Sequence, residues 1–310
     1  MMKRHESAPA GGANRGGLWK NERGQFRLVW LWLAGFAIYA LLNRGAEAVV
    51  ALTMHRLNAY LNALATVVEL QTPLWASAIL DHYDPILSMV EGLMTIAVFL
   101  WLSRRFRLGG GHHHAFRLTQ ALRWMLAGVL GAVAGVAICL AVDSLRLERT
   151  LTEPTFSLAT ALLLPVCAIS TMAGEVFAMD YLYESARLHI SRWASILLIV
   201  AVEFVAEGGW HLHPIGMVNV GLQVLICCLM HDRFGLAAPL GLWFGWNYVL
   251  QALFVQGGGV WPVYHVSEAW LTGDGHLIFG GAWATLFMLG IVALLALPEL
   301  RRRRRAHRLE

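Results

Sequence analysis

A small set of polar side chains lies inside long apolar stretches of this 310-residue sequence. An ionisable group at bilayer depth costs free energy unless it is paired or hydrated, so each one is a candidate for function. Carboxylates that share a low-dielectric site compete for ionisation, and one that is held close to neutrality can act as a general base. The residues concerned are Glu175, Asp180, Glu203, Glu207, His211 and Asn247.

Three of these residues have the spacing of one helix face. Glu203, Glu207 and His211 follow one another at intervals of four residues, which places them on the same side of a helix. With a rise of about 1.5 Å per residue, Glu175, Glu203 and Asn247 are all expected roughly 10–15 Å from the cytoplasmic surface. We therefore expect the acidic stripe to face Glu175. The cluster is either a general-base site or a buried hydrogen-bond network that locks three spans together.

A metal site receives only weak support. Glu207 and His211 have the spacing of two metal ligands on a helix, but a pair of ligands is weak evidence. The sequence has no HExxH motif, and a packing role is favoured for His211. The four cysteines lie inside apolar runs without CxxC spacing, which predicts packed thiols rather than disulfides or metal ligands. Neither a metal nor a cofactor is predicted.

The composition indicates that these residues belong to a membrane protein. Hydrophobic residues make up 57% of the chain and charged residues 14%, whereas soluble domains carry about 25% charged residues. A helix needs about 20 apolar residues to cross a bilayer. The sequence therefore predicts an all-α, polytopic bundle of about eight transmembrane helices. The expected spans lie near Phe26–Leu42, Pro85–Leu102, Trp124–Val142, Phe156–Tyr181, Trp193–Trp210, Pro214–Leu229, Leu236–Phe254 and Leu277–Leu297.

The expected layout is one transmembrane domain between two polar tails. The domain covers residues 26–298, and the tails are residues 1–25 and the basic segment 299–310. Residues 46–84 are only moderately apolar, and we expect them to form an external loop that contains an interfacial amphipathic helix. A ninth span in that region is the competing topology.

The distribution of Lys and Arg predicts how the chain is oriented. With the N-terminus in the cytoplasm, 20 of the 24 Lys and Arg residues fall on the cytoplasmic side, as the positive-inside rule requires. The basic run from Arg301 to Arg305 is typical of an anchor on anionic lipid. No nucleic-acid-binding motif accompanies it, so no nucleic-acid partner is expected. We expect a multi-pass protein of a bacterial inner membrane, with both termini cytoplasmic and with lipid, a peptide or a membrane protein as partner.

The sequence between Met172 and Phe254 resembles the CPBP superfamily, which comprises the type II CAAX prenyl endopeptidases and related bacteriocin-processing proteins. The first family motif, EExxxR followed by a G-Y-L-like segment, is matched by Gly174 to Leu182. The second, an apolar helix that ends in FxxxH, aligns with Ile196 to Glu207. The third, HxxxN after a Pro-Leu-Gly-Leu stretch, aligns with Pro239 to Asn247. The resemblance implies a CAAX-protease-like membrane bundle, with an internal chamber and a motif core at residues 156–254.

Most catalytic positions of the family are replaced in this chain. In active relatives, the leading glutamate of the first motif and the histidine of the second activate water. The histidine and asparagine of the third motif stabilise the oxyanion. The residues at these four positions and at the motif arginine are Gly174, Glu207, Trp243, Asn247 and Met179. Only Asn247 and the motif's second glutamate, Glu175, keep the residue type of the family.

For an active enzyme, the resemblance implies that Glu175, Glu207 and Asn247 are catalytic, with Glu203 and Trp243 in support. Trp243 keeps one N–H that can serve an oxyanion, and Glu207 can replace a histidine as a base. A shift of the second alignment by one residue would instead leave a glycine, Gly208, at the histidine position.

Three hypotheses follow from these residues. The first is a non-catalytic family member that holds a peptide, a lipidated tail or a partner helix. The second is a divergent glutamic intramembrane endopeptidase. The third is a proton-coupled or ion-coupled carrier that uses the acidic stripe.

Overall fold

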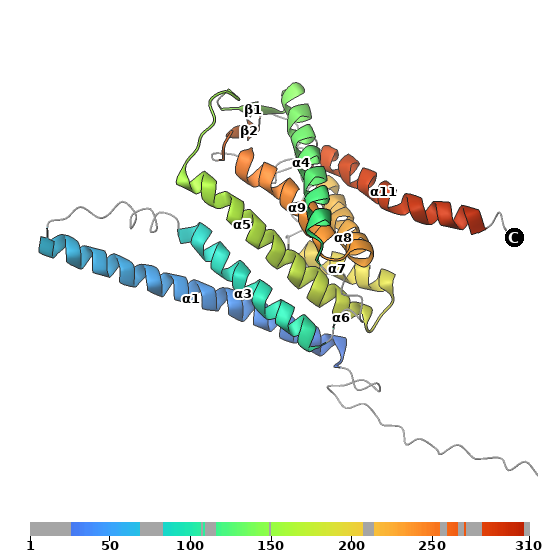
Figure 1. Cartoon of the computed structure of the whole chain (residues 1–310), viewed down its shortest axis with the longest axis horizontal. Helices are drawn as coiled ribbons and strands as arrows, with labels where there is room; N and C mark the ends of the chain where they lie inside the picture. The colour runs from blue at the N-terminus through green and yellow to red at the C-terminus, as the bar shows by residue number, and fades with distance from the viewer. Residues whose placement is uncertain are drawn as a thin grey trace, which may run out of the picture.

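The structure is a computed structural model that describes residues 26–68, 83–106, 108, 116–148, 150–206, 214–254, 259–265, 270 and 281–306. These residues form a bundle of helices with one short two-stranded sheet (Figure 1), in agreement with the expected all-α class. The elements are, in chain order, α1 (Leu28–Val68), α3 (Tyr83–Arg105), α4 (Leu118–Ala141), β1 (Leu145–Leu147), α5 (Leu158–Glu175), the π-helix η1 (Val176–Tyr183), α6 (Glu184–Arg187), α7 (Arg192–Ala206), α8 (Pro214–Phe234), α9 (Ala237–Tyr248), the π-helix η3 (Val249–Leu253), β2 (Val263–His265) and α11 (Ala282–Ala306).

Five helical segments in this part of the chain are long and apolar enough to cross a membrane, and they identify a multi-pass membrane protein. The fourth of them combines α5, η1 and α6 into one continuous segment. The other expected spans correspond to shorter helices. α7 has 15 residues, and the apolar part of α11 is Ala282–Leu297. α9 has 12 residues and is followed directly by the π-helix η3. The five long segments are Leu28–Ala63, Tyr83–Arg105, Leu118–Ala141, Thr160–Arg187 and Pro214–Phe234.

The first helix is longer than the sequence predicted. We expected a span that ends near Leu42 and an external loop from residue 46, but α1 continues without a break to Val68. The loop's expected start is therefore wrong, and residues 69–82 lie outside the described ranges. The continuation is rich in the helix formers Ala and Leu and has no proline. At about 1.5 Å per residue, the 41 residues of α1 extend about 60 Å, twice the roughly 30 Å of a bilayer core.

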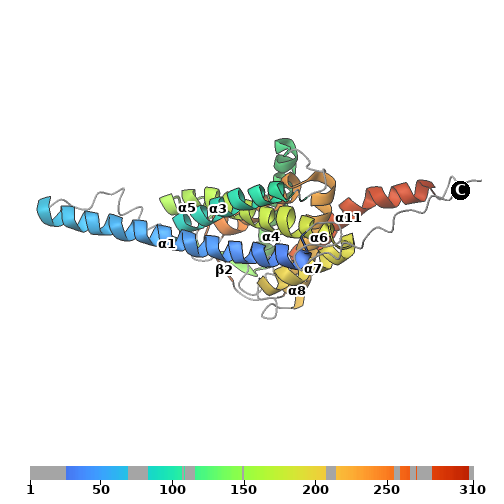
Figure 2. The same cartoon turned by 90° about the horizontal axis from the view of Figure 1, so that it is seen from below.

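The beginning of α1 is held against η1 and α6 by an aromatic and a polar contact. Trp32 Nε1 donates a hydrogen bond to Ser185 Oγ at 2.9 Å, and the ring of Tyr39 stacks on Phe177 at 4.8 Å between centroids. Figure 2 shows that this part of α1 lies along the bundle and that the rest of the helix extends past it.

Helices α4 and α9 pack with their backbones in close contact, because glycines line the contact. Gly241 and Gly245 on α9 have the GxxxG spacing that allows membrane helices to approach closely. A Cβ atom at either position would collide with the backbone of α4, at Ala121 and Met125 respectively. Gly128 on α4 lies equally close to the backbone of Leu242. This contact fixes the rotation of α9, and with it the placement of Trp243 and Asn247.

A tight turn joins α4 to the small sheet. Asp143 has a positive φ of 57°, in the left-handed region that side chains rarely adopt. Arg146 Nε donates to Asp143 Oδ1 at 2.7 Å, and this hydrogen bond lowers the pKa of Asp143 below its ordinary value. β1 then pairs antiparallel with β2, with Arg146 opposite Tyr264. The sheet thus joins the turn after α4 to the segment that precedes α11.

Candidate functional site

Glu175 is the last residue of α5 and lies at the centre of the candidate site. Its side chain is only 7% exposed. Cys227 on α8 donates its Sγ–H to Glu175 Oε1 at 3.4 Å. The other carboxylate oxygen, Oε2, is buried and has no hydrogen-bond partner among the residues described. A buried carboxylate with one uncommitted oxygen is costly, so this group is the strongest sign of function in the bundle.

Trp243 reaches the same place from α9. Its indole N–H donates to Cys227 Sγ at 2.8 Å, so the sulfur of Cys227 joins the indole to the carboxylate of Glu175. Since an indole has one N–H, the donor that was expected to serve an oxyanion is used by a thiol. We refer to Glu175, Cys227 and Trp243 as the Glu175 cluster.

Polar contacts continue from the Glu175 cluster along the interface between α5 and α9. Asn247 Nδ2 donates a long hydrogen bond to Thr171 Oγ1 at 3.5 Å. One turn further, Cys167 donates to Gln251 Oε1 at 3.6 Å. The partners move by four residues from α9 into η3 as they move back by four along α5, as expected for antiparallel helices that share one seam. Asn247 therefore lies one turn away from Glu175, on the same seam.

The acidic stripe is represented by one of its three residues. Glu203 on α7 is half-buried and lies close enough for its charge to act on Glu175. The other two, Glu207 and His211, lie outside the residues that the structure describes. Glu175, Glu203, Trp243 and Asn247 thus come from three helices, α5, α7 and α9. The expected packing of the thiols is confirmed, since Cys139, Cys167, Cys227 and Cys228 are all buried and free.

Gly174 occupies the position next to Glu175 and faces open space. A Cβ atom placed there would meet no atom of the described residues within 4 Å. Gly174 is exposed whereas Glu175 is buried, so a side chain at position 174 would extend into this open space without displacing a described neighbour.

Two π-helical segments begin at the candidate site. η1 starts immediately after Glu175, and η3 starts two residues after Asn247. π-helical turns are rare and occur frequently at functional sites. No residue pattern in the sequence pointed to them, because a π turn differs from an α turn by one residue in its hydrogen bonding and keeps the same apolar character.

A second polar cluster, which the sequence analysis missed apart from Asp180, lies where α8 meets η1 and α6. His231 Nε2 lies 3.0 Å from Glu184 Oε1 and 3.8 Å from Asp180 Oδ1. The next residue, Asp232, pairs through Oδ2 with Arg192 Nε at 2.7 Å and accepts a hydrogen bond from Tyr183 at 3.0 Å. The only signal in the sequence was the consecutive His231 and Asp232 at the end of an apolar helix.

The described residues contain no group of three or more His, Cys, Asp or Glu side chains arranged to hold a metal ion. What the Glu175 cluster offers chemically is a buried carboxylate, a thiol in contact with it and an indole that orients the thiol. Comparison of the chain with protein-family models, with curated proteins and with solved structures finds no match.

Proposed function

We propose that this chain is a non-catalytic relative of the CPBP membrane proteins, which holds a peptide segment such as a lipidated tail or a partner helix. The proposal includes eight spans, a bacterial inner membrane and cytoplasmic termini, and the Lys and Arg distribution is the argument for the orientation. It rests on the resemblance of residues 172–254 and on the convergence of α5, α7, α8 and α9 at Glu175.

One observation carries the non-catalytic part of the proposal. At the position of the family's leading glutamate stands Gly174, beside open space. A glycine cannot act as a base, and its exposed position leaves room for part of a bound segment. The engagement of the Trp243 N–H with Cys227 supports the same conclusion, because it commits the donor that an oxyanion would need.

Site-specific photocrosslinking tests the proposal. A photoreactive amino acid at position 174 is expected to form a discrete adduct with a peptide or membrane protein in living cells. Position 290 on α11 is the matched control, because Gly290 also has open space around its Cβ position. An adduct that forms equally at both positions, or at neither, would contradict a binding role for the space beside Gly174.

A divergent peptidase is the second candidate, and the uncommitted Oε2 of Glu175 favours it. In that case Glu175 and Glu207 activate water and Asn247 assists the oxyanion. Proteomics of a deletion strain complemented with wild type, Glu175→Gln or Glu207→Gln separates the two candidates. A binding protein is expected to be complemented by both variants. Accumulation of the same uncleaved protein in the deletion strain and in both variants would instead establish the peptidase.

A further inference from the structure

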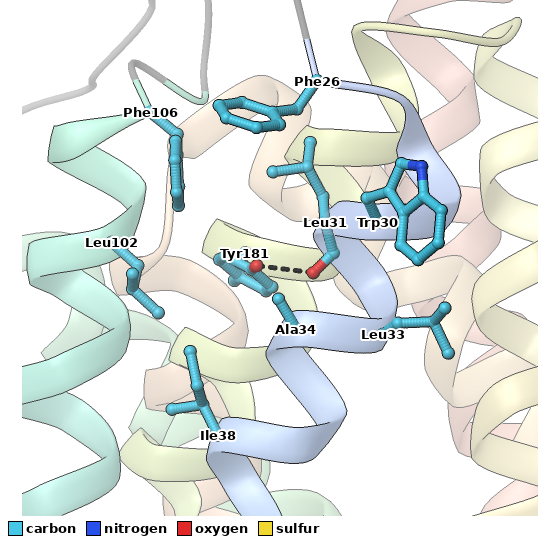
Figure 3. A pocket seen from close by; sticks show the side chains of 9 residues that line it. All are labelled: Phe26, Trp30, Leu31, Leu33, Ala34, Ile38, Leu102, Phe106 and Tyr181. Atoms are coloured by element: carbon cyan, nitrogen blue, oxygen red, sulfur yellow. Dashed lines mark hydrogen bonds between the residues drawn. The ribbon is translucent and has the colours of Figure 1, made fainter. Parts of the chain in front are cut away.

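An apolar pocket of about 430 Å³ lies between the first turns of α1, the last turns of α3 and η1. This volume falls in the range of pockets that bind small ligands. Figure 3 shows side chains from all three elements that line it, with Phe26 and Phe106 at one end and Ile38 at the other. The pocket is separate from the Glu175 cluster, because none of that cluster's residues contributes to its wall.

The hydroxyl group of Tyr181, the one tyrosine in the wall of the pocket, is already engaged in a hydrogen bond. Tyr181 donates its hydroxyl hydrogen to the backbone oxygen of Leu31 at 2.6 Å, as the dashed line in Figure 3 shows. This bond satisfies the hydroxyl inside an otherwise apolar surface. The chemistry of the wall therefore selects a hydrocarbon chain rather than a polar molecule.

The end of the pocket at Phe26 and Phe106 has the opposite character. Phe26 and Phe106 meet edge to face there, with their ring centroids 5.8 Å apart, and each is followed or preceded by an exposed arginine. Arg27 follows Phe26. Arg105 precedes Phe106 and lies three residues after Leu102, which also lines the pocket, so it shares that side of α3. Neither arginine forms an ion pair with another described residue.

We propose that this pocket binds an anionic phospholipid, with an acyl chain between α1, α3 and η1 and the phosphate on Arg27 and Arg105. The two parts of the site match the two parts of such a molecule. Basic pockets between transmembrane helices bind anionic headgroups in this way. Charge complementarity distinguishes this occupant from a zwitterionic lipid, whose headgroup carries no net charge to match the arginines.

Lipid retention by the full-length protein tests the proposal. Purified protein in mild detergent is mixed with phosphatidylglycerol or phosphatidylcholine of identical acyl chains, and bound lipid is counted by native mass spectrometry. The wild type is expected to retain phosphatidylglycerol preferentially. The double variant Arg27→Gln and Arg105→Gln is expected to bind it about tenfold more weakly or worse, because each arginine contributes to headgroup binding.

A second variant separates the pocket from the surface charge. Ala34→Trp places a large side chain in the pocket and is expected to abolish retention while both arginines remain. Arg301→Gln with Arg302→Gln removes the same charge from α11 and is expected to bind like wild type. Equal retention of the two lipids by wild type would overturn the proposal. Unchanged retention by the Arg27 and Arg105 double variant, whose positions are both exposed, would overturn it as well.

Discussion

Trp243 on α9 donates its indole N–H to the sulfur of Cys227 on α8 at a distance of 2.8 Å. The same sulfur contacts the carboxylate of Glu175 on α5. One buried atom thus connects three helices beside Glu175, which is the least exposed acidic residue among those that the structure describes. The contact makes Cys227 a structural part of the candidate site, although no family motif includes it.

Removal of this sulfur should destabilise the bundle. We expect Cys227→Ala to lower the free energy of unfolding by about 1–3 kcal/mol, because it leaves the indole N–H and both carboxylate oxygens buried without a partner. Trp243→Phe removes the donor at the same time as its need for a partner. The double variant should therefore lose less stability than the sum of the two single variants. Reversible unfolding in mixed micelles measures all three, and strict additivity would contradict a direct contact.

The glycine contact between α4 and α9 predicts a pair of opposite outcomes for the same substitution. Gly245→Leu should destabilise the protein by about 1–3 kcal/mol or prevent folding, because the added side chain must displace the backbone of α4 at Met125. Gly290→Leu is the matched control on α11, where a Cβ atom meets open space. It should leave the midpoint of thermal unfolding nearly unchanged. Equal loss in both variants would show that glycine is needed for helix formation in general and not for this contact.

The ion pairs of Asp232 should matter more than those on the surface. Asp232→Asn is expected to lower the free energy of unfolding by about 1–3 kcal/mol, because a half-buried Arg192 and the hydroxyl of Tyr183 both depend on this carboxylate. Asp143→Asn also removes one carboxylate from an arginine, but that pair is exposed. Its effect should be too small to resolve. Thermal unfolding of the two variants side by side makes the comparison, and a larger effect at Asp143 would contradict it.

The turn after α4 gives a prediction for pH. Since Arg146 holds the pKa of Asp143 below its ordinary value in the folded state, the stabilisation from this pair is present above the pKa of the unfolded chain. It is lost as the pH falls through the lower folded value. NMR titration of the Asp143 carboxyl should show this low pKa. In the Arg146→Gln variant, the pKa of Asp143 should rise toward the ordinary range, and an unchanged titration would refute the assignment.

The sequence predicted the parts of the molecule that depend on composition and helical spacing. The membrane character, the packed thiols and the nearness of Glu203 to Glu175 follow from apolar length and from residue positions counted along helices. These quantities accumulate over many residues, so errors of a few residues at each boundary do not change them.

The rest depended on tertiary packing that a single sequence does not express. Apolar length alone did not reveal that α1 continues past Leu42, because moderate hydropathy is typical of both an interfacial helix and the extension of a long one. The partner of Trp243 was also not predictable. It depends on the rotation of α9 about its own axis. The close contact of Gly241 and Gly245 with the backbone of α4 fixes that rotation.

The length of α1 has a practical consequence for experimental work. The later turns of α1 continue in one piece past the bundle (Figure 1), and most of the described side chains from Ala51 to Ala63 are exposed. The first turns of this helix pack against the bundle, so the helix is a rigid arm. A marker domain can be fused to such an arm without a flexible joint. Such a fiducial would give this small protein the mass and asymmetry that particle alignment in electron cryomicroscopy requires.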